Sequence, residues 1–129
     1  EWFSVSREGQ VRQLTHFGDL FLDAKIGHAN WSPDGQRLAF WLDARPGLCE
    51  GQNLVVLDAE TQQDTNYCIL GSDDQTVLAL PPIWSPDSRY VAVSSYQTGV
   101  SHAILIDIQQ GWAALIGEDA YPVGWLALP

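Results

Sequence analysis

Methionine is absent from the sequence, and lysine plus arginine account for only 6 of the 129 residues. With no initiator residue and no charged-then-apolar leader, we expect a processed form or a piece of a longer protein. Long apolar runs are lacking too. The longest, Trp112 to Gly117, ends at Glu118, far short of the roughly 18 residues that a membrane-spanning helix needs. We therefore expect no membrane span.

Basic residues are too few and too scattered to attract polyanions. The 16 acidic residues outnumber the 6 basic ones, which gives a formal charge of −10 and a pI near 4.3. Such a chain is repelled by nucleic-acid backbones and by anionic membrane surfaces. We therefore exclude nucleic acid as a partner. The six basic residues are Arg7, Arg12, Lys25, Arg37, Arg45 and Arg89.

Cysteine is nearly absent as well, since Cys49 and Cys68 are the only two. One pair falls short of the four ligands of a structural zinc site. The two residues could form a disulfide, which requires an oxidising compartment, or remain free thiols in the core. The sequence alone leaves both alternatives open.

The sequence does contain a repeat. Residues 31–40 read WSPDGQRLAF and residues 84–93 read WSPDSRYVAV, so four residues are identical in a row and the apolar pattern continues after them. A degraded third copy, YPVGW, occupies residues 121–125. The three tryptophans lie 53 and 41 residues apart. Periods of this length indicate arrays of one supersecondary unit.

Each repeat consists of short apolar runs rich in β-branched and aromatic residues, which predicts strands rather than helices. Ser-Pro-Asp-Gly predicts a tight turn, because proline presets φ, aspartate bonds to its own backbone and glycine tolerates positive φ. No window has the 3.6-residue period of a capped helix. The pattern predicts an all-β chain of about eleven strands in four-stranded antiparallel units, the architecture of β-propeller blades.

The pattern predicts that residues 1–129 form a partial β-propeller of about 2.75 blades. Residues 1–20 are expected to end one blade, residues 26–70 and 80–116 to form two complete blades, and residues 121–129 to form the first strand of another. A closed ring needs at least four blades, so two large apolar faces are left to cover. Either the chain is part of a longer propeller, or copies of it complete a ring as a homo-oligomer.

The repeated pattern resembles the TolB-type (WD40-like) β-propeller repeat. It consists of a tryptophan followed by a Ser-Pro-Asp-Gly turn, then Leu-Ala-Phe, and then an apolar strand that ends in aspartate. The resemblance covers nearly the whole chain. It implies a bacterial periplasmic or extracellular scaffold that binds a protein or peptide, without catalysis or a cofactor. Family members also occur as propeller domains of prolyl-oligopeptidase-like hydrolases, which is the alternative function. A third possible function is that of a glycan-active enzyme, which uses a pair of acidic residues. The sequence places no such pair of acids in one cleft.

Four residues of the repeated motif are expected to be structural. Trp31 and Trp84 recur at the same place and should pack between blades. Asp34 and Asp87 should cap their turns rather than bind a metal. The second copy departs from the repeat at Ser88, where the first has glycine.

The two cysteines belong to the same expected blade. Cys49 lies in a connection that is longer than its counterpart in the next blade, and Cys68 lies in the last strand. A Cys49–Cys68 disulfide would fasten the inner hairpin to the outer strand. By the chain-entropy estimate, a disulfide that closes a loop of this size stabilises the folded chain by about 3 kcal/mol. The family repeat does not require this bridge.

Calcium is the one ion for which the sequence offers a candidate site. Asp73 and Asp74, with Glu60 and Asp64 not far away in the sequence, could supply carboxylate oxygens. They form no calcium-loop motif, however, so we expect a solvated acidic loop.

No set of catalytic residues emerges. The histidines match no zinc spacing, and the serines lie in no Gly-x-Ser-x-Gly elbow. Cys49 is a poor nucleophile, because the carboxylate of Glu50 disfavours its thiolate. Asp19 and Asp23 are candidates for acids that face a central channel. The histidines and serines considered are His16, His28, His102, Ser94, Ser95 and Ser101.

Three further tryptophans, Trp2, Trp41 and Trp112, lie outside the repeated position. We expect each to pack in the core. One that is exposed instead could bind a sugar or a peptide, because indole combines a large apolar surface with one hydrogen-bond donor.

Overall fold

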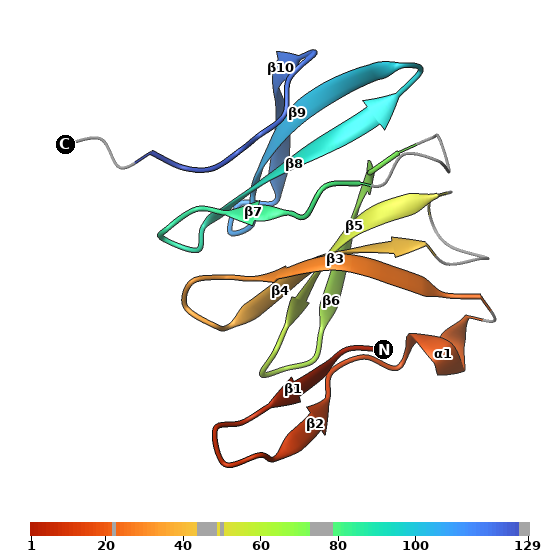
Figure 1. Cartoon of the computed structure of the whole chain (residues 1–129), viewed down its shortest axis with the longest axis vertical. Helices are drawn as coiled ribbons and strands as arrows, with labels where there is room; N and C mark the ends of the chain where they lie inside the picture. The colour runs from red at the N-terminus through yellow and green to blue at the C-terminus, as the bar shows by residue number, and fades with distance from the viewer. Residues whose placement is uncertain (22, 44–48, 50, 73–78, 127–129) are drawn as a thin grey trace.

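The computed structural model describes residues 1–21, 23–43, 49, 51–72 and 79–126. These residues form three antiparallel sheets of two, four and four strands, which lie one above another in Figure 1. The expected all-β architecture of an incomplete propeller is confirmed. The order along the chain is a hairpin, a complete blade, a second complete blade and an irregular outer segment.

The first sheet is the hairpin of β1 (Phe3–Val5) and β2 (Val11–Gln13), followed by α1 (Phe17–Leu20). The sequence predicts the hairpin but not the helix. α1 has a single turn, so a 3.6-residue period cannot register in its sequence. Burial of Phe17 and a hydrogen bond from the Gly18 N–H to the Glu1 carboxylate hold it in place.

Each complete blade orders its four strands as they occur in the chain. The second blade ends at residue 118, two residues beyond the expected boundary. The strands of the first blade are β3 (Lys25–Trp31), β4 (Arg37–Asp43), β5 (Gln52–Asp58) and β6 (Asp64–Leu70). Those of the second are β7 (Ile83–Trp84), β8 (Tyr90–Gln97), β9 (Val100–Asp107) and β10 (Trp112–Glu118).

The central strands of the first blade, β4 and β5, are buried on both faces, and successive residues of a strand point to opposite sides. Along β4, one set of alternate side chains faces the second blade and the other faces the hairpin. The cluster between the blades contains Ala39, Trp41, Leu54, Val56, Ala79, Trp84, Val91, Val93 and Ile106. The cluster under the hairpin contains Leu14, Phe17, Leu38, Phe40, Leu42, Val55 and Leu57.

The chain passes closely between the blades at Gly71. A Cβ atom there would lie 2.8 Å from the Ala79 Cβ and 3.0 Å from the ring of Trp41, so only glycine fits. The Gly71 carbonyl accepts a hydrogen bond from the Tyr96 N–H, which ties the end of the first blade to β8. This contact contributes to fixing the position of the two blades relative to each other.

Residues 120–126, here called the outer segment, form no strand, although the sequence predicts a first strand over 121–129. Residues 127–129 lie outside the described residues. A first strand pairs with the second strand of its own blade, and no such strand is present in the described part of the chain. The segment is nevertheless anchored to the second blade, because the Ser101 hydroxyl donates to the Tyr121 hydroxyl at 2.6 Å.

Candidate functional site

The two Trp-Ser-Pro-Asp turns are built alike and lie at the same end of the blades, on the left in Figure 1. The Ser32 hydroxyl donates to Asp34 Oδ1 at 2.5 Å, and the Ser85 hydroxyl donates to Asp87 Oδ1 at 2.5 Å. Each serine oxygen also accepts the N–H of the residue that begins the next strand, at 2.9 and 2.8 Å. Both aspartates therefore bond within their own turns.

These bonds favour the ionised carboxylates. The hydrogen bond from Ser32 holds the pKa of Asp34 below its ordinary value, and the bond from Ser85 does the same for the pKa of Asp87. Backbone N–H donors in each turn act in the same direction.

An ion pair between half-buried Arg89 and buried Asp107 fixes the C-terminal end of β9. Asp107 is fully buried, and its Oδ2 accepts from Arg89 Nη2 at 2.7 Å and Nε at 2.9 Å. Burial alone would raise the pKa of Asp107, but the bonds from Arg89 and from two backbone N–H groups hold it below the ordinary value. The Arg89 guanidinium also lies 4.9 Å from the ring centre of Tyr90, which stacks on Trp125 of the outer segment.

We expect the chain to lose stability in acid. The pKa values of Asp34, Asp58, Asp87 and Asp107 are depressed in the folded state, so the unfolded chain binds more protons near its ordinary aspartate pKa of about 3.9. Their contribution to stability is complete above that value and is lost as the pH falls through the lower, folded values. Urea unfolding at a series of pH values should show a decline that starts below about pH 5.

The double variant Asp34→Asn, Asp87→Asn is the control for this acid response. It keeps the side-chain acceptors but removes two titrating groups, so its stability should fall less steeply with decreasing pH. A wild-type stability that rises on acidification below the ordinary aspartate pKa would contradict the assignment.

Ser88, where the second turn departs from the repeat, connects the two turns. Its φ is 59°, the left-handed region that Gly35 occupies at 73° in the first turn. Its hydroxyl accepts the backbone N–H of Asp34 at 3.1 Å. The serine therefore adopts a backbone conformation that favours glycine, and it adds a hydrogen bond between successive blades.

A second kind of hydrogen bond links successive repeats, from a tryptophan Nε1 to a backbone carbonyl, and it occurs twice. Trp84 Nε1 donates to the carbonyl of Asn30 at 2.9 Å, and Asn30 is the residue before Trp31. Trp125 Nε1 donates to the carbonyl of Ile83 at 3.4 Å, and Ile83 is the residue before Trp84. The second and third repeats thus bond through their tryptophans to the same position of the preceding repeat.

Trp31 holds the equivalent position in the first blade, but its indole N–H has no acceptor among the described residues. Its side chain is 40% exposed, whereas Trp84 is 6% exposed and lies between the blades. The sequence predicts that both pack between blades. Trp84 does so, but Trp31 is only partly covered, because the described part of the chain provides no first strand ahead of it.

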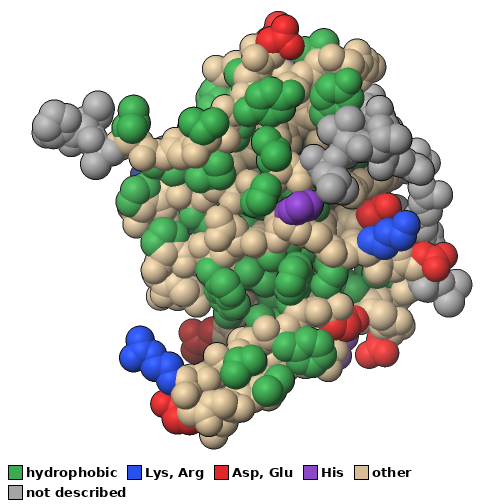
Figure 2. Space-filling model, viewed as in Figure 1, with side chains coloured by type: hydrophobic (Ala, Val, Ile, Leu, Met, Phe, Trp, Pro, Cys, Tyr) green, Lys and Arg blue, Asp and Glu red, His purple; other side chains and the backbone are tan. Residues whose placement is uncertain are grey.

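A groove opens beside Trp31, between the hairpin and the first blade. Its cavity is about 270 Å³. Figure 2 shows hydrophobic side chains on the viewed face between the hairpin, at the bottom, and the blade above it. The Trp2 indole nitrogen is buried and has no hydrogen-bond partner in the described part of the chain. We call this cavity the Trp2–Trp31 groove; it is lined by Trp2, Phe3, Ala29, Asn30, Trp31 and Leu38.

One edge of β1 is free beside this groove. Among the residues that the structure describes, β1 pairs only with β2, and the Leu14 N–H donates to the Trp2 carbonyl. Hydrogen-bonded positions alternate along an antiparallel pair. The N–H and C=O groups of Phe3 and Val5 therefore point away from β2, toward the free edge.

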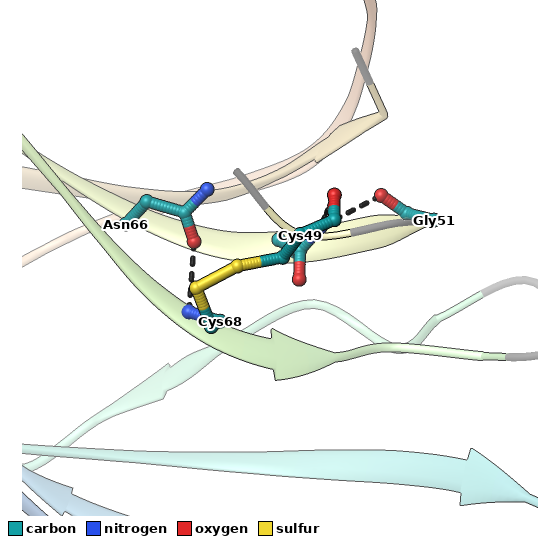
Figure 3. Close-up of a disulfide and its surroundings, with 5 residues drawn as sticks. Cys49, Gly51, Asn66 and Cys68 are labelled. Carbon is teal, nitrogen blue, oxygen red and sulfur yellow. Dashed lines mark hydrogen bonds between the residues drawn. A yellow bond between two sulfur atoms is a disulfide. The ribbon is translucent and has the colours of Figure 1, made fainter. Parts of the chain in front are cut away.

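Cys49 and Cys68 form a disulfide, with their Cα atoms 5.7 Å apart (Figure 3). It joins the connection before β5 to β6, as the sequence predicts. The Cys68 N–H donates to Asn66 Oδ1 at 2.8 Å, and the Cys49 carbonyl accepts from Asn53 Nδ2 at 3.0 Å. Of the two alternatives, the bridge is formed, which fits an oxidising compartment outside the cytoplasm.

The structure assembles no catalytic or metal centre from the remaining candidates within the described residues. No group of three histidine, cysteine, aspartate or glutamate side chains is close enough to hold a metal ion there. Asp73 and Asp74 lie outside the described residues. His16 lies 3.8 Å from Asp19, on the surface. Ser95 accepts from Gln97 rather than from a histidine.

The outlying tryptophans have different environments. Trp41 is buried and its Nε1 donates to the Leu80 carbonyl at 2.8 Å. Trp2 packs edge-on against Phe40. Trp112 is 40% exposed, so the expectation of core packing is wrong for it, because β10 is the outer strand of its blade.

The sequence pattern alone does not predict that Phe3 and Asn30 line a groove. One signal could have found Asn30. It precedes Trp31 as Ile83 precedes Trp84, and in the structure both carbonyls accept a tryptophan N–H.

The stacked four-stranded antiparallel sheets, joined by a recurring contact, define the chain as a sector of a β-propeller. The crystal structure of TolB from Acinetobacter baumannii matches with a TM-score of 0.62 and 14% identity, over 89% of this chain and 26% of that chain. A structure from a study of two prolyl endopeptidases matches with a TM-score of 0.63 and 19% identity, over 87% of this chain and 18% of that chain.

The predicted resemblance to TolB-type propellers is therefore confirmed at the level of the fold. The chain spans about a quarter of the TolB chain and under a fifth of the prolyl endopeptidase chain. No family model and no curated protein matches the sequence. The described residues contain no helix long and apolar enough to cross a membrane.

Proposed function

We propose that the chain is a non-catalytic binding module that takes up an extended segment of a protein in the Trp2–Trp31 groove. The observation that carries the proposal is an edge of β1 that has no partner strand among the described residues, beside a groove whose two tryptophans have indole N–H groups without an acceptor in that part of the chain. Addition of a strand to an exposed sheet edge is a recurrent mode of peptide recognition.

The groove supplies both parts of such an interaction. Backbone N–H and C=O groups of Phe3 and Val5 pair with the incoming strand, and Trp31 donates its indole N–H to a backbone carbonyl of that segment. Alternate side chains of the strand enter the cavity of about 270 Å³. The charge of −10 disfavours acidic partners, so the segment is neutral or basic.

The two complete blades indicate what such a segment looks like. In each, the third strand pairs on its inner side with the second strand of a hairpin that contains a Trp-Ser-Pro-Asp turn. β1 and β2 correspond to the third and fourth strands of a blade. Their complement is therefore a hairpin of the same kind as β7–β8.

A synthetic peptide of residues 83–97 serves as the probe. We expect it to bind the chain, as measured by calorimetry, and Trp31→Ala to weaken binding about tenfold, a loss of about 1.4 kcal/mol typical of a central aromatic contact. Trp112→Ala is the matched control, because that tryptophan is equally exposed but lies on the second blade. Equal losses in both variants, or no binding at all, would refute strand addition in the groove.

We place the protein outside the cytoplasm of a bacterium. The disulfide supports an oxidising compartment, and the structural likeness to TolB supports a bacterial propeller protein.

A second candidate is an accessory propeller segment of a hydrolase, favoured by the likeness to a prolyl endopeptidase. A coding sequence that joins this segment to a hydrolase domain would support it. In that full-length protein, Trp31→Ala should change which peptide sizes are hydrolysed. It should leave the rate of the chemical step unchanged.

A further inference from the structure

The disulfide joins two cysteines that differ in their access to solvent. Cys68 is exposed, whereas Cys49 is half-buried. Cys68 lies in β6, the outer strand of the first blade, which pairs only with β5 among the described residues. This blade has a neighbour on each side. The second blade packs on one face, and on the other the hairpin reaches the β5–β6 turn, where the Gln62 side chain donates to the Gln13 carbonyl at 2.9 Å. Cys68 is therefore accessible at the outer edge of a blade whose two sides are both occupied.

Cys68 also lies at an irregular point of β6. Asn53 pairs with Leu70 and Val55 pairs with Asn66, so one residue of β5 lies opposite three residues of β6. Cys68 is the middle residue of the three. Its φ of 50° lies in the left-handed region, which residues other than glycine rarely adopt. The strand therefore bulges at the cysteine, and its regular pairing with β5 is interrupted there.

Hydrogen bonds that do not involve sulfur hold both cysteines in place. The buried side chain of Asn53 donates through its Nδ2 to the Cys49 carbonyl at 3.0 Å and to the Gly51 carbonyl at 2.8 Å. On the other side of the bridge, the Cys68 N–H donates to Asn66 Oδ1 at 2.8 Å (Figure 3). None of these bonds contains a sulfur atom, so the S–S bond can be exchanged while the chain around it stays folded.

We propose that the bridge is a thiol–disulfide exchange site of the folded chain, and that a protein dithiol attacks it at the Sγ of Cys68. Exposed disulfides are the ones that exchange readily, and access helps to decide which of the two sulfurs is attacked. Cys68 is the exposed partner of the pair. The site is separate from the Trp2–Trp31 groove, so this inference does not depend on the proposed function.

The exchange proceeds in two steps. A thiolate of the dithiol forms a bond to the Sγ of Cys68, and the bond between the two cysteines breaks; its electron pair leaves on the Sγ of Cys49, which takes a proton from water. The second thiol of the reagent then loses its proton and attacks the reagent's own sulfur in the mixed disulfide, so that Cys68 leaves and is protonated. The chain gains two electrons and two protons, and the dithiol loses the same. Reduction thus detaches the connection before β5 from β6.

Trapping of the first step identifies the sulfur that is attacked. The folded wild-type chain is treated with excess glutathione, the reaction is stopped with N-ethylmaleimide, and the adducts are located by peptide mass mapping. We expect glutathione on Cys68 and maleimide on Cys49 in most of the trapped chains. The chain unfolded in concentrated urea is the control, because both sulfurs are then accessible and the two adducts should form in similar amounts. A folded chain that carries glutathione equally on both cysteines, or mostly on Cys49, would overturn the proposal.

The urea dependence of reduction shows whether the folded chain itself reacts. The wild type is reduced with dithiothreitol at urea concentrations below the unfolding transition, and the rate is corrected with oxidised glutathione reduced under the same conditions. We expect a rate proportional to the dithiothreitol concentration that changes by less than about twofold per molar urea. If reduction required unfolding, the rate would rise by about fivefold or more per molar, the usual dependence for small proteins. A rise steeper than about twofold per molar, or a rate that reaches a plateau with dithiothreitol, would overturn the proposal.

Discussion

Replacing Trp84 with alanine is expected to lower the free energy of unfolding by about 3–5 kcal/mol, the usual cost of truncating a large buried aromatic residue. Trp84 is 6% exposed and lies in the cluster between the two blades. Its indole also donates to the Asn30 carbonyl, which the truncation leaves without its partner. Since domains of this size are stable by about 5–15 kcal/mol, the loss is a large share of the total. Urea unfolding followed by circular dichroism measures it.

Trp31→Ala is the matched control, because it changes the same residue of the same motif. Trp31 is 40% exposed and its indole has no acceptor among the described residues, so the loss should be well below that of Trp84→Ala. Trp84→Phe separates packing from hydrogen bonding, because it keeps an aromatic ring and removes the N–H donor. Equal losses at Trp31 and Trp84 would contradict the difference in their surroundings.

Removing the disulfide is expected to have the second-largest effect on stability. The double variant Cys49→Ala, Cys68→Ala should lose about 3 kcal/mol, because the bridge closes a loop of 19 residues and restricts the unfolded chain. The bond joins the connection before β5 to the outer strand β6, so its loss should loosen this side of the first blade first. Urea unfolding of the variant and of the wild type measures the difference.

Reduction provides an independent control for the disulfide. A thiol reductant should lower the stability of the wild type by a similar amount and leave the double variant unchanged. A wild type whose unfolding is insensitive to a reductant that demonstrably breaks the bond would show that the bridge contributes little.

Local sequence signals predict most of this fold. The two Ser-Pro-Asp turns, with the β-branched and aromatic runs around them, indicate the hairpins and the two complete blades. The repeat itself identifies Trp31 and Trp84 as equivalent positions. Each turn and each strand is a local feature that can be read from a window of about ten residues, whereas the repeat is found by comparing two such windows.

The differences between sequence and structure arise from contacts between distant residues. α1 depends on the carboxylate of Glu1 and on burial of Phe17, neither of which a helical period reveals. The role of Ser88 as a bridge depends on the N–H of Asp34 in the preceding turn. The outer segment lacks strand pairing because its expected neighbour is not among the described residues.

The candidate binding site could be predicted only in part. An incomplete number of blades implies uncovered apolar surface, but not where its hydrogen-bonding groups lie. The groove depends on how Phe3 of the hairpin and Ala29 of β3 meet in space, and on which edge of β1 remains free.

Hydrogen exchange at the indole N–H groups, followed by nuclear magnetic resonance, tests most directly whether successive blades bond through their tryptophans. The indole of Trp84, bonded to Asn30 inside the blade interface, should be strongly protected, whereas that of Trp112, which donates to the exposed Gln110 side chain at the surface, should exchange rapidly. The two indole N–H groups are compared within one wild-type spectrum. The variant Asn30→Pro cannot serve as a control, because it disrupts β3. Exchange of Trp84 as fast as that of Trp112 would contradict the stacking of blades described above.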